Sequence, residues 1–127
     1  MAFGTPGADG QDQWSLTFFL RCVHYGMTPQ QAIDFPSFSS SHFPSSFGGS
    51  AQPMVLGLEG RLPAETAEAL KALGHKVNYK AEGWTSEAWT GGMMTAVGRG
   101  GGGETGKPLN LWAAANARGM NCYAVGR

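Results

Sequence analysis

The turn that follows the first few residues holds the backbone groups best suited to catalysis. Gly4, Gly7 and Gly10 recur at every third position, between the end of an expected strand and the start of an expected helix. N–H groups in such a turn can point together at a negative charge, and the dipole of the following helix adds to the attraction. Enzymes use this arrangement as an oxyanion hole, which stabilises the charge on a carbonyl oxygen under attack. Most turns of this kind only reverse the chain, so the pattern alone leaves both interpretations open.

A second glycine-rich segment, Arg99–Lys107, resembles a phosphate-binding loop. From Gly101 it fits the pattern G-x-x-x-x-G-K. That motif also needs a Ser or Thr next, to hold magnesium, and a helix whose N-terminus faces the phosphates. The next residue is Pro108, and Leu109–Trp112 has the pattern of a strand. We therefore interpret the segment as a hairpin loop and reject nucleotide binding.

Composition excludes several other classes of function. The 127 residues carry a formal net charge of zero and only 14% are charged, so no basic surface for nucleic acid is expected. The sequence contains no run of 18 apolar residues, which is about the length needed to cross a membrane. The first ten residues do not have the pattern of a signal peptide, which leaves a cytoplasmic and a periplasmic location both open. A hydrophobic fraction of 42% is sufficient for a folded core.

Nothing in the sequence predicts a metal or a cofactor. The three histidines are isolated, without a second ligand at the spacing of a metal site. Cys22 and Cys122 lie in unrelated settings, and we interpret both as small buried apolar residues rather than as a disulfide.

The first half of the chain is expected to begin with the end of a strand, at residues 1–3, and to continue with two helices. The first runs from about Asp12 to Tyr25, with Asp9 or Asp12 as its cap, and is apolar nearly all round, as a helix inside a larger structure would be. The second begins after Thr28, with Gln31 completing a capping box, and ends near Phe35. Residues 36–53 are expected to be irregular and pinned to a surface by three phenylalanines, Phe38, Phe43 and Phe47.

The second half is expected to alternate strands with a further helix. The expected elements are a strand at Met54–Leu58, a helix at Pro63–Leu73, a strand at His75–Lys80, and a strand pair at Gly91–Gly98 and Leu109–Ala115. This order favours an α+β layer arrangement.

Several stretches, distributed over most of the chain, are similar to a known family. They are Phe3–Gln11, Gly26–Met27, Gln31–Asp34, Pro36, His42–Pro44, Leu70–Val77, Ala113–Gly119 and Tyr123–Gly126. In this order and spacing they resemble gamma-glutamyltransferases (gamma-glutamyltranspeptidases), which have a Pro-Gly-Gly turn, a Gly-His-x-Val element and a closing Ala-Ala-Asp-Pro-Arg region. The likeness is weakest across residues 45–62 and 81–108.

The resemblance implies a fold and a mechanism. The fold is a partial αββα sandwich of the N-terminal-nucleophile hydrolase type, without the strands that carry the nucleophile. Residues 1–127 would be the C-terminal fragment of the small subunit. Its partners would be the large subunit and the segment that bears the nucleophile, and its substrate a small gamma-glutamyl compound. In the family a Thr takes the gamma-glutamyl group and passes it to water or to an amino acid or peptide. No cofactor is implied, and by resemblance the N–H groups of Gly7 and Ala8 form the oxyanion hole.

The sequence departs from the family at several positions. Ala8 replaces the second glycine of the turn, and Ser37 and Ser39 stand where the family has Arg and His. The closing Asp-Pro-Arg has become Asn116-Ala117-Arg118. Two alternatives therefore remain: a non-catalytic remnant, and a related amide hydrolase of the cephalosporin-acylase type.

Overall fold

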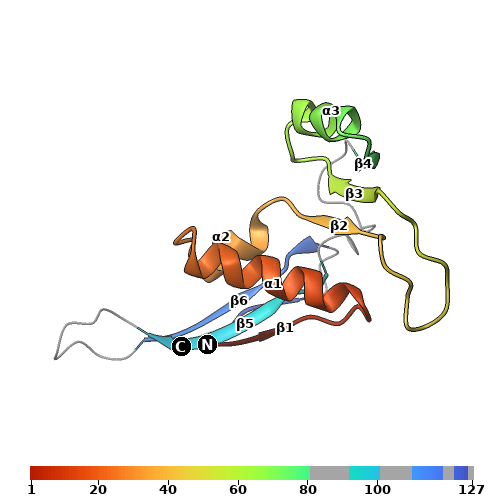
Figure 1. Ribbon diagram of the computed structural model, residues 1–127. Helices are drawn as coiled ribbons and strands as arrows, with labels where there is room; N and C mark the ends of the chain where they lie inside the picture. The colour runs from red at the N-terminus through yellow and green to blue at the C-terminus, as the bar shows by residue number, and fades with distance from the viewer. Residues whose placement is uncertain (81–91, 101–109, 119–121, 126–127) are drawn as a thin grey trace.

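The computed structural model describes residues 1–80, 92–100, 110–118 and 122–125. Within these ranges the chain forms two three-stranded sheets and three helices (Figure 1). Their order is β1 (Ala2–Gly4), α1 (Gly10–Val23), α2 (Pro29–Asp34), β2 (Phe38–Ser40), β3 (Val55–Glu59), α3 (Ala64–Ala72), β4 (Lys76–Lys80), β5 (Thr95–Gly100) and β6 (Asn110–Ala115). The α+β expectation is confirmed.

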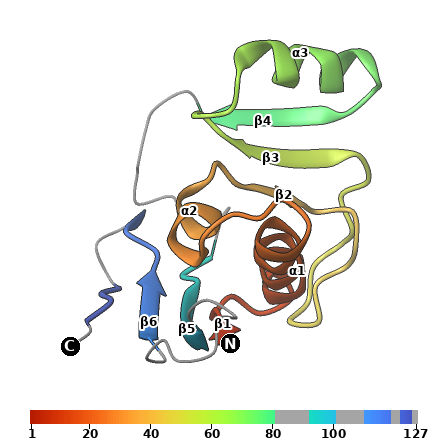
Figure 2. The same ribbon diagram turned by 90° about the vertical axis from the view of Figure 1, so that its left-hand side faces the viewer.

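The first sheet has the antiparallel order β1-β5-β6, and α1 and α2 cover one of its faces (Figures 1 and 2). The core lies between them, because Trp14 and Phe18 of α1 and Ile33 of α2 are buried against the sheet. Successive side chains of a strand point to opposite faces, so Ala96 faces this core whereas Val97 lies on the other face. Val97 is 55% exposed and Leu111, on the same face, is 76% exposed. This second face of the sheet is apolar and open.

The second sheet has the order β2-β3-β4 and carries α3 (Figure 2). Its strands β3 and β4 are parallel, and parallel neighbours need a crossover connection, which α3 supplies. The sequence predicted this β3-α3-β4 unit within about two residues at each boundary.

Most predicted helix signals are confirmed. Thr28 and Gln31 form the capping box that begins α2. Gly26, just after the last turn of α1, has the left-handed φ of 64° that glycine favours at such a position, and Gly74 after α3 has a φ of 94°. The predicted strand pair near the C-terminus is also present as β5 and β6. Residues 101–109, which include the predicted hairpin loop, lie outside the described part, but Asn110 begins a strand and not the helix that a phosphate-binding loop requires.

The segment 36–53 differs from the expectation. It contains the strand β2, and the phenylalanines expected to pin it are exposed, Phe43 by 77% and Phe47 by 80%. Polar contacts hold the segment instead. The side-chain amide of Gln13 in α1 donates to the carbonyl oxygen of Ser40 at 2.9 Å and accepts from its N–H at 2.7 Å. The side chain of Gln13 thus makes the hydrogen bonds that a neighbouring strand would make at the edge of β2. The serine-rich composition of the segment did not predict this contact.

The helix α1 is only half covered, as its apolar sequence predicted. Trp14 and Phe18 are buried, whereas Leu16 is 58% exposed and Val23 is 55% exposed. Among the described residues, none of the helices has the length and apolar character needed to cross a membrane.

Candidate active site

The glycine-rich turn between β1 and α1 has an unusual backbone. Gly7 has a φ of 133° and Ala8 a φ of 50°, so two successive residues lie in regions that favour glycine. Alanine in the left-handed region costs about 1–2 kcal/mol. The carbonyl oxygens of both residues are used, because Gly10 N–H donates to Gly7 at 3.0 Å and Gln11 N–H donates to Ala8 at 3.1 Å. The turn is thereby fixed to the first residues of the helix.

The N–H groups of Gly7 and Ala8 are available for a ligand. Within the described residues neither N–H donates to an atom of the protein. Both residues line a cavity of about 740 Å³, together with the start of α1 and parts of the segment 39–52, including Ser39, Ser40, Ser41, Phe43 and Gln52. Two unpaired donors at the N-terminal end of a helix, beside a cavity, are the arrangement that binds a developing negative charge.

The indole of Trp14 explains why two of the three regularly spaced residues are glycine. A Cβ at Gly7 would overlap the Trp14 ring, and a Cβ at Gly10 would lie 2.6 Å from its Cη2. Nothing lies within 4 Å of a Cβ at Gly4. Packing against Trp14 therefore requires glycine at positions 7 and 10, and at position 7 the backbone conformation requires it as well. Sequence reasoning missed the contribution of Trp14.

The sequence predicts Asp9 or Asp12 as the cap of α1. Asp9 does not cap the helix with its side chain. It occupies the N-cap position without a side-chain bond to the helix. Its carboxylate instead accepts hydrogen bonds from the N–H and the hydroxyl of Ser46, and these lower its pKa from the usual value. Because Ser46 belongs to the segment that borders the cavity, Asp9 ties this segment to the turn.

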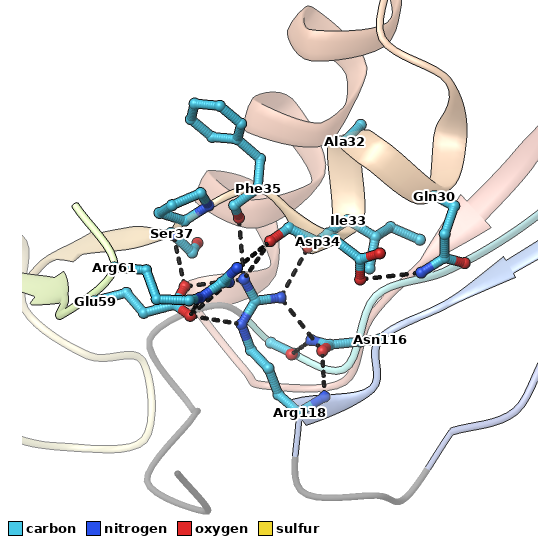
Figure 3. A network of polar contacts seen from close by, with 12 residues as sticks. Gln30, Ala32, Ile33, Asp34, Phe35, Ser37, Glu59, Arg61, Asn116 and Arg118 are labelled. Atoms are coloured by element: carbon cyan, nitrogen blue, oxygen red, sulfur yellow. Dashed lines mark hydrogen bonds and ion pairs between the residues drawn. The ribbon is translucent and has the colours of Figure 1, made fainter. Parts of the chain in front are cut away.

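A second cluster of polar residues lies behind the turn, where the two sheets meet α2 (Figure 3). Arg118 is 4% exposed and binds the carboxylate of Glu59 with two nitrogens, Nη2 at 2.9 Å and Nε at 3.2 Å. Arg61 Nε binds the same carboxylate at 2.6 Å, and Ser37 N–H donates to it at 2.8 Å. Glu59 thus binds two guanidinium groups, one two positions away in the chain and one 59 positions away.

Three arginines of this region cap the C-terminal end of α2. Arg118 donates to the carbonyl oxygens of Ile33, Asp34 and Phe35, Arg61 donates to that of Asp34, and Arg21 to those of Ala32, Phe35 and Pro36. These carbonyls need partners because Pro36 prevents continuation of the helix. Positive charge at the C-terminal end of a helix is also favoured by its dipole. The arginines therefore fix α2 against both sheets.

The same cluster accounts for one departure from the family pattern, at Ser37. Ser37, which stands where the family has Arg, is 6% exposed and contacts Glu59 through its backbone. The carboxylate of Glu59 does not lack cations there, because Arg61 and Arg118 bind it. Ser39 lies in β2, pairs with Gly57 and lines the cavity. No motif in the sequence predicted a role for Glu59 or Arg61, whereas Arg118 belongs to the closing stretch that resembles the family.

The pKa of Glu59 lies below its usual value of 4.5. Burial alone would raise this pKa, but the hydrogen bond and charge of Arg118, the N–H of Ser37 and the hydrogen bond of Arg61 together outweigh the effect of burial.

We expect the free energy of unfolding to decrease as the pH falls below the ordinary Glu value of 4.5. The carboxyl of Glu59 is the stronger acid in the folded state, so the unfolded state binds the proton first. Its contribution to stability is complete above the unfolded pKa and is lost as the pH falls through the folded pKa. Denaturant unfolding of the assembled protein at pH values from about 3 to about 6 measures the slope, and Glu59→Gln should reduce it. An unchanged slope in Glu59→Gln would contradict this assignment.

No metal site accompanies these features in the described part of the chain, where no three His, Cys, Asp or Glu side chains gather to hold an ion. Cys22 and Cys122 are free thiols.

The comparisons with known proteins agree with the arrangement of helices and sheets. The model of the gamma-glutamyltranspeptidase family matches residues 1–125. The chain belongs to the gamma-glutamyltranspeptidase family. Over 75 residues it is 36% identical to the glutathione hydrolase-like YwrD proenzyme of Bacillus subtilis (strain 168), a match that covers 59% of this chain and 13% of that protein.

Solved structures of the family share the fold. Two structures of a protein designated LmbA2991 are 38% and 40% identical to this chain, with TM-scores of 0.78 and 0.79, and each match covers 99% of this chain and 21% of the other. The cephalosporin acylase from Bacillus halodurans is 20% identical, with a TM-score of 0.66, over 91% of this chain and 18% of that one. The chain therefore has the N-terminal-nucleophile hydrolase type of fold found in gamma-glutamyltranspeptidases and acylases, and spans about a fifth of the length of LmbA2991.

Proposed function

We propose that this chain supplies the oxyanion-binding part of a gamma-glutamyl hydrolase or transferase. The observation that carries the proposal is the turn of Gly7 and Ala8, which has two unpaired N–H groups beside a cavity at a helix N-terminus. This turn lies in the stretch that resembles the family's Pro-Gly-Gly turn. Membership of the gamma-glutamyltranspeptidase family supports the same reaction class.

In this proposal the nucleophile is a Thr that lies outside the 127 residues. Its hydroxyl oxygen attacks the gamma-carbonyl carbon of a small gamma-glutamyl substrate, and the carbonyl oxygen gains a negative charge. The N–H groups of Gly7 and Ala8 donate to that oxygen and lower the barrier. The amine of the same Thr accepts the proton of the hydroxyl and passes it to the leaving amine, which departs when the carbonyl re-forms. Water or an acceptor amino acid or peptide then takes the acyl group.

The partners of this chain in the proposal are the large subunit and the nucleophile-bearing segment of the same enzyme, as we expected from the sequence. We propose that they cover the open face of the first sheet. A cavity of about 700 Å³ lies on that face, bordered by Ala2, Val97, Leu111, Ala113 and Val125. Exposed apolar patches of this kind mark contact surfaces. The occupant is a further part of the family's enzyme, because this chain covers only 13% of YwrD and 21% of LmbA2991.

We expect the isolated chain to show only background rates with a gamma-glutamyl anilide, because the Thr nucleophile is missing from it. We also expect it to aggregate, or to bind a hydrophobic dye strongly, through the open sheet face and the exposed side of α1. Addition of the nucleophile-bearing segments should restore turnover and suppress dye binding. A chromogenic assay and a dye titration measure both effects. Turnover by the isolated chain, or a monodisperse monomer with a sharp and reversible thermal transition, would contradict this expectation.

A second candidate is an amide hydrolase of the cephalosporin-acylase type. The fold shared with the acylase from Bacillus halodurans favours it, and the same oxyanion turn would serve it. A panel of gamma-glutamyl and acyl anilides, given to the assembled enzyme, separates the two by their kcat/KM values. Failure of every substrate would leave the third alternative, a non-catalytic remnant.

A further inference from the structure

The strained turn of Gly7 and Ala8 is connected to residues 92–94 and to Asn116 by a short chain of hydrogen bonds, of which the bond between Asn116 and Gly92 is buried. The hydroxyl of Thr5 accepts a hydrogen bond from Met93 N–H at 2.8 Å and donates to the carbonyl oxygen of Pro6 at 2.8 Å. Pro6 directly precedes Gly7. Thr5 therefore connects the turn to residues 92–94, which are far away in the sequence.

Gly92 is packed between the turn and Trp14. A Cβ at this position would lie 2.5 Å from Thr5 Oγ1 and 2.5 Å from Trp14 Cε3. The same Trp14 ring contacts Gly7 and Gly10, as described above. Movement of residue 92 would consequently be transmitted to Thr5 and to Trp14, and through both of them to the turn.

Asn116 holds residues 92–94 in place. Its side chain is fully buried, with 0% exposure, and its Nδ2 donates to the carbonyl oxygen of Gly92. Its backbone N–H donates to Met94 O at 2.9 Å. Its Oδ1 accepts from Arg118 N–H at 2.8 Å and from Arg118 Nη1 at 3.3 Å. Since the donors of Arg118 face Oδ1 and the carbonyl oxygen of Gly92 faces Nδ2, these neighbours fix the orientation of the Asn116 amide.

We infer that Asn116 and Thr5 are positioning residues that hold the N–H groups of Gly7 and Ala8 in their catalytic orientation. The catalytic part of this inference, that the oriented N–H groups bind an oxyanion, rests on the proposed function. A carboxylate at residue 116 could still accept from Arg118, but it could not donate to Gly92 while ionised. The carbonyl of Gly92 would then face a negative oxygen.

The test uses the enzyme made by grafting this chain onto LmbA2991 in place of the residues that it matches. Two variants remove the relevant donors: Asn116→Asp keeps the size of the side chain, and Thr5→Val keeps the shape but loses the hydroxyl. Thr5→Ser restores the hydroxyl. Thr17→Val is the matched control, because the Thr17 hydroxyl donates to Gln13 O within α1 at 2.7 Å, away from this route.

The first readout is hydrogen exchange of Gly10 and Gln11, whose N–H groups bind the carbonyls of the turn. We expect exchange to be about tenfold faster in Asn116→Asp and in Thr5→Val than in the parent, with Thr5→Ser and Thr17→Val unchanged. This readout needs no catalysis. If Asn116→Asp fails to fold, the exchange rates in Thr5→Val alone decide whether the inference holds. Equal exchange rates in Thr5→Val and Thr17→Val would overturn the inference.

The second readout is steady-state turnover of an acyl anilide. Misplaced donors should lower kcat by about 10- to 100-fold and leave KM within about twofold, because the ground state does not use the oxyanion hole. Thr5→Ser should recover most of kcat. Unchanged kcat in both variants would overturn the positioning role. A grafted parent that turns over no substrate would contradict the proposed function, while the exchange experiment would still decide whether Asn116 and Thr5 order the turn.

Discussion

An ester in place of the peptide bond between Gly7 and Ala8 is expected to lower kcat of the assembled enzyme by about 10²- to 10³-fold. Incorporation of L-lactic acid at position 8 replaces the Ala8 N–H by oxygen and keeps the methyl group. The carbonyl of residue 8 is unchanged, whereas the carbonyl of Gly7 becomes an ester carbonyl and accepts more weakly from Gly10 N–H. The N–H is the only hydrogen-bonding group removed outright, and it acts in the transition state, so KM should change little.

The control is the same ester at Ala64. Its amide is at the first position of the helix α3, which has no side-chain cap at its N-terminus, whereas Ala8 lies two residues before α1. The chemical change is thus identical, but it lies far from the cavity. Turnover per folded molecule is measured for both esters. Equal turnover of the Ala8 ester and the Ala64 ester would show that this N–H does not serve catalysis.

The structure rules out the simpler variant Gly7→Pro for this purpose. Proline requires a φ near −65°, whereas Gly7 has a φ of 133° and its hydrogen atoms face the Trp14 ring. The substitution would remove the N–H and also distort the turn, so a loss of activity would have two causes. The ester separates them.

Arg118→Met is expected to destabilise the folded protein by about 3–5 kcal/mol. The substitution leaves the carboxylate of Glu59 with one guanidinium in place of two, and it leaves the carbonyl of Ile33 without the Arg118 donor. Buried groups that lose a partner incur the cost of their desolvation. Denaturant unfolding of the assembled enzyme, followed by tryptophan fluorescence, measures the change.

Lys71→Met is the matched control for the loss of a cation. Lys71 pairs with Glu68 on the surface of α3, where both side chains are exposed. Such pairs contribute about 0–1 kcal/mol. The double variant Glu59→Leu with Arg118→Met should lose less stability than the sum of the losses in the two single variants, because both single variants break the same contact. Similar losses in Lys71→Met and Arg118→Met would refute the assignment of Arg118 as a buried connection between α2 and the two sheets.

Local sequence signals predicted the elements well. The capping box at Thr28 and Gln31, the glycine after each of α1 and α3, and the alternation of β4 depend on neighbouring residues, and each is present in the structure. The family resemblance placed the candidate oxyanion turn at Gly7 and Ala8. In the structure Ala8 has a φ of 50°, in the region that favours glycine.

Contacts between distant residues could not be predicted in the same way. The pairing of Gln13 with β2 spans 27 positions, and the contact between Arg118 and Glu59 spans 59. No periodicity or spacing encodes such a pair. The same reason explains why Asp9, one of the two caps predicted for α1, does not bind the helix with its side chain: Ser46, 37 positions away, binds its carboxylate.

The position of the oxyanion tests the account most directly. A tetrahedral boronic acid analogue of a gamma-glutamyl substrate, bound to the nucleophile of the assembled enzyme, would place an oxygen where the negative charge develops. We predict that the nitrogens of Gly7 and Ala8 lie about 2.7–3.1 Å from that oxygen in a crystal structure of the adduct. An oxygen that binds other donors, with both of these nitrogens beyond about 3.5 Å, would contradict the assignment.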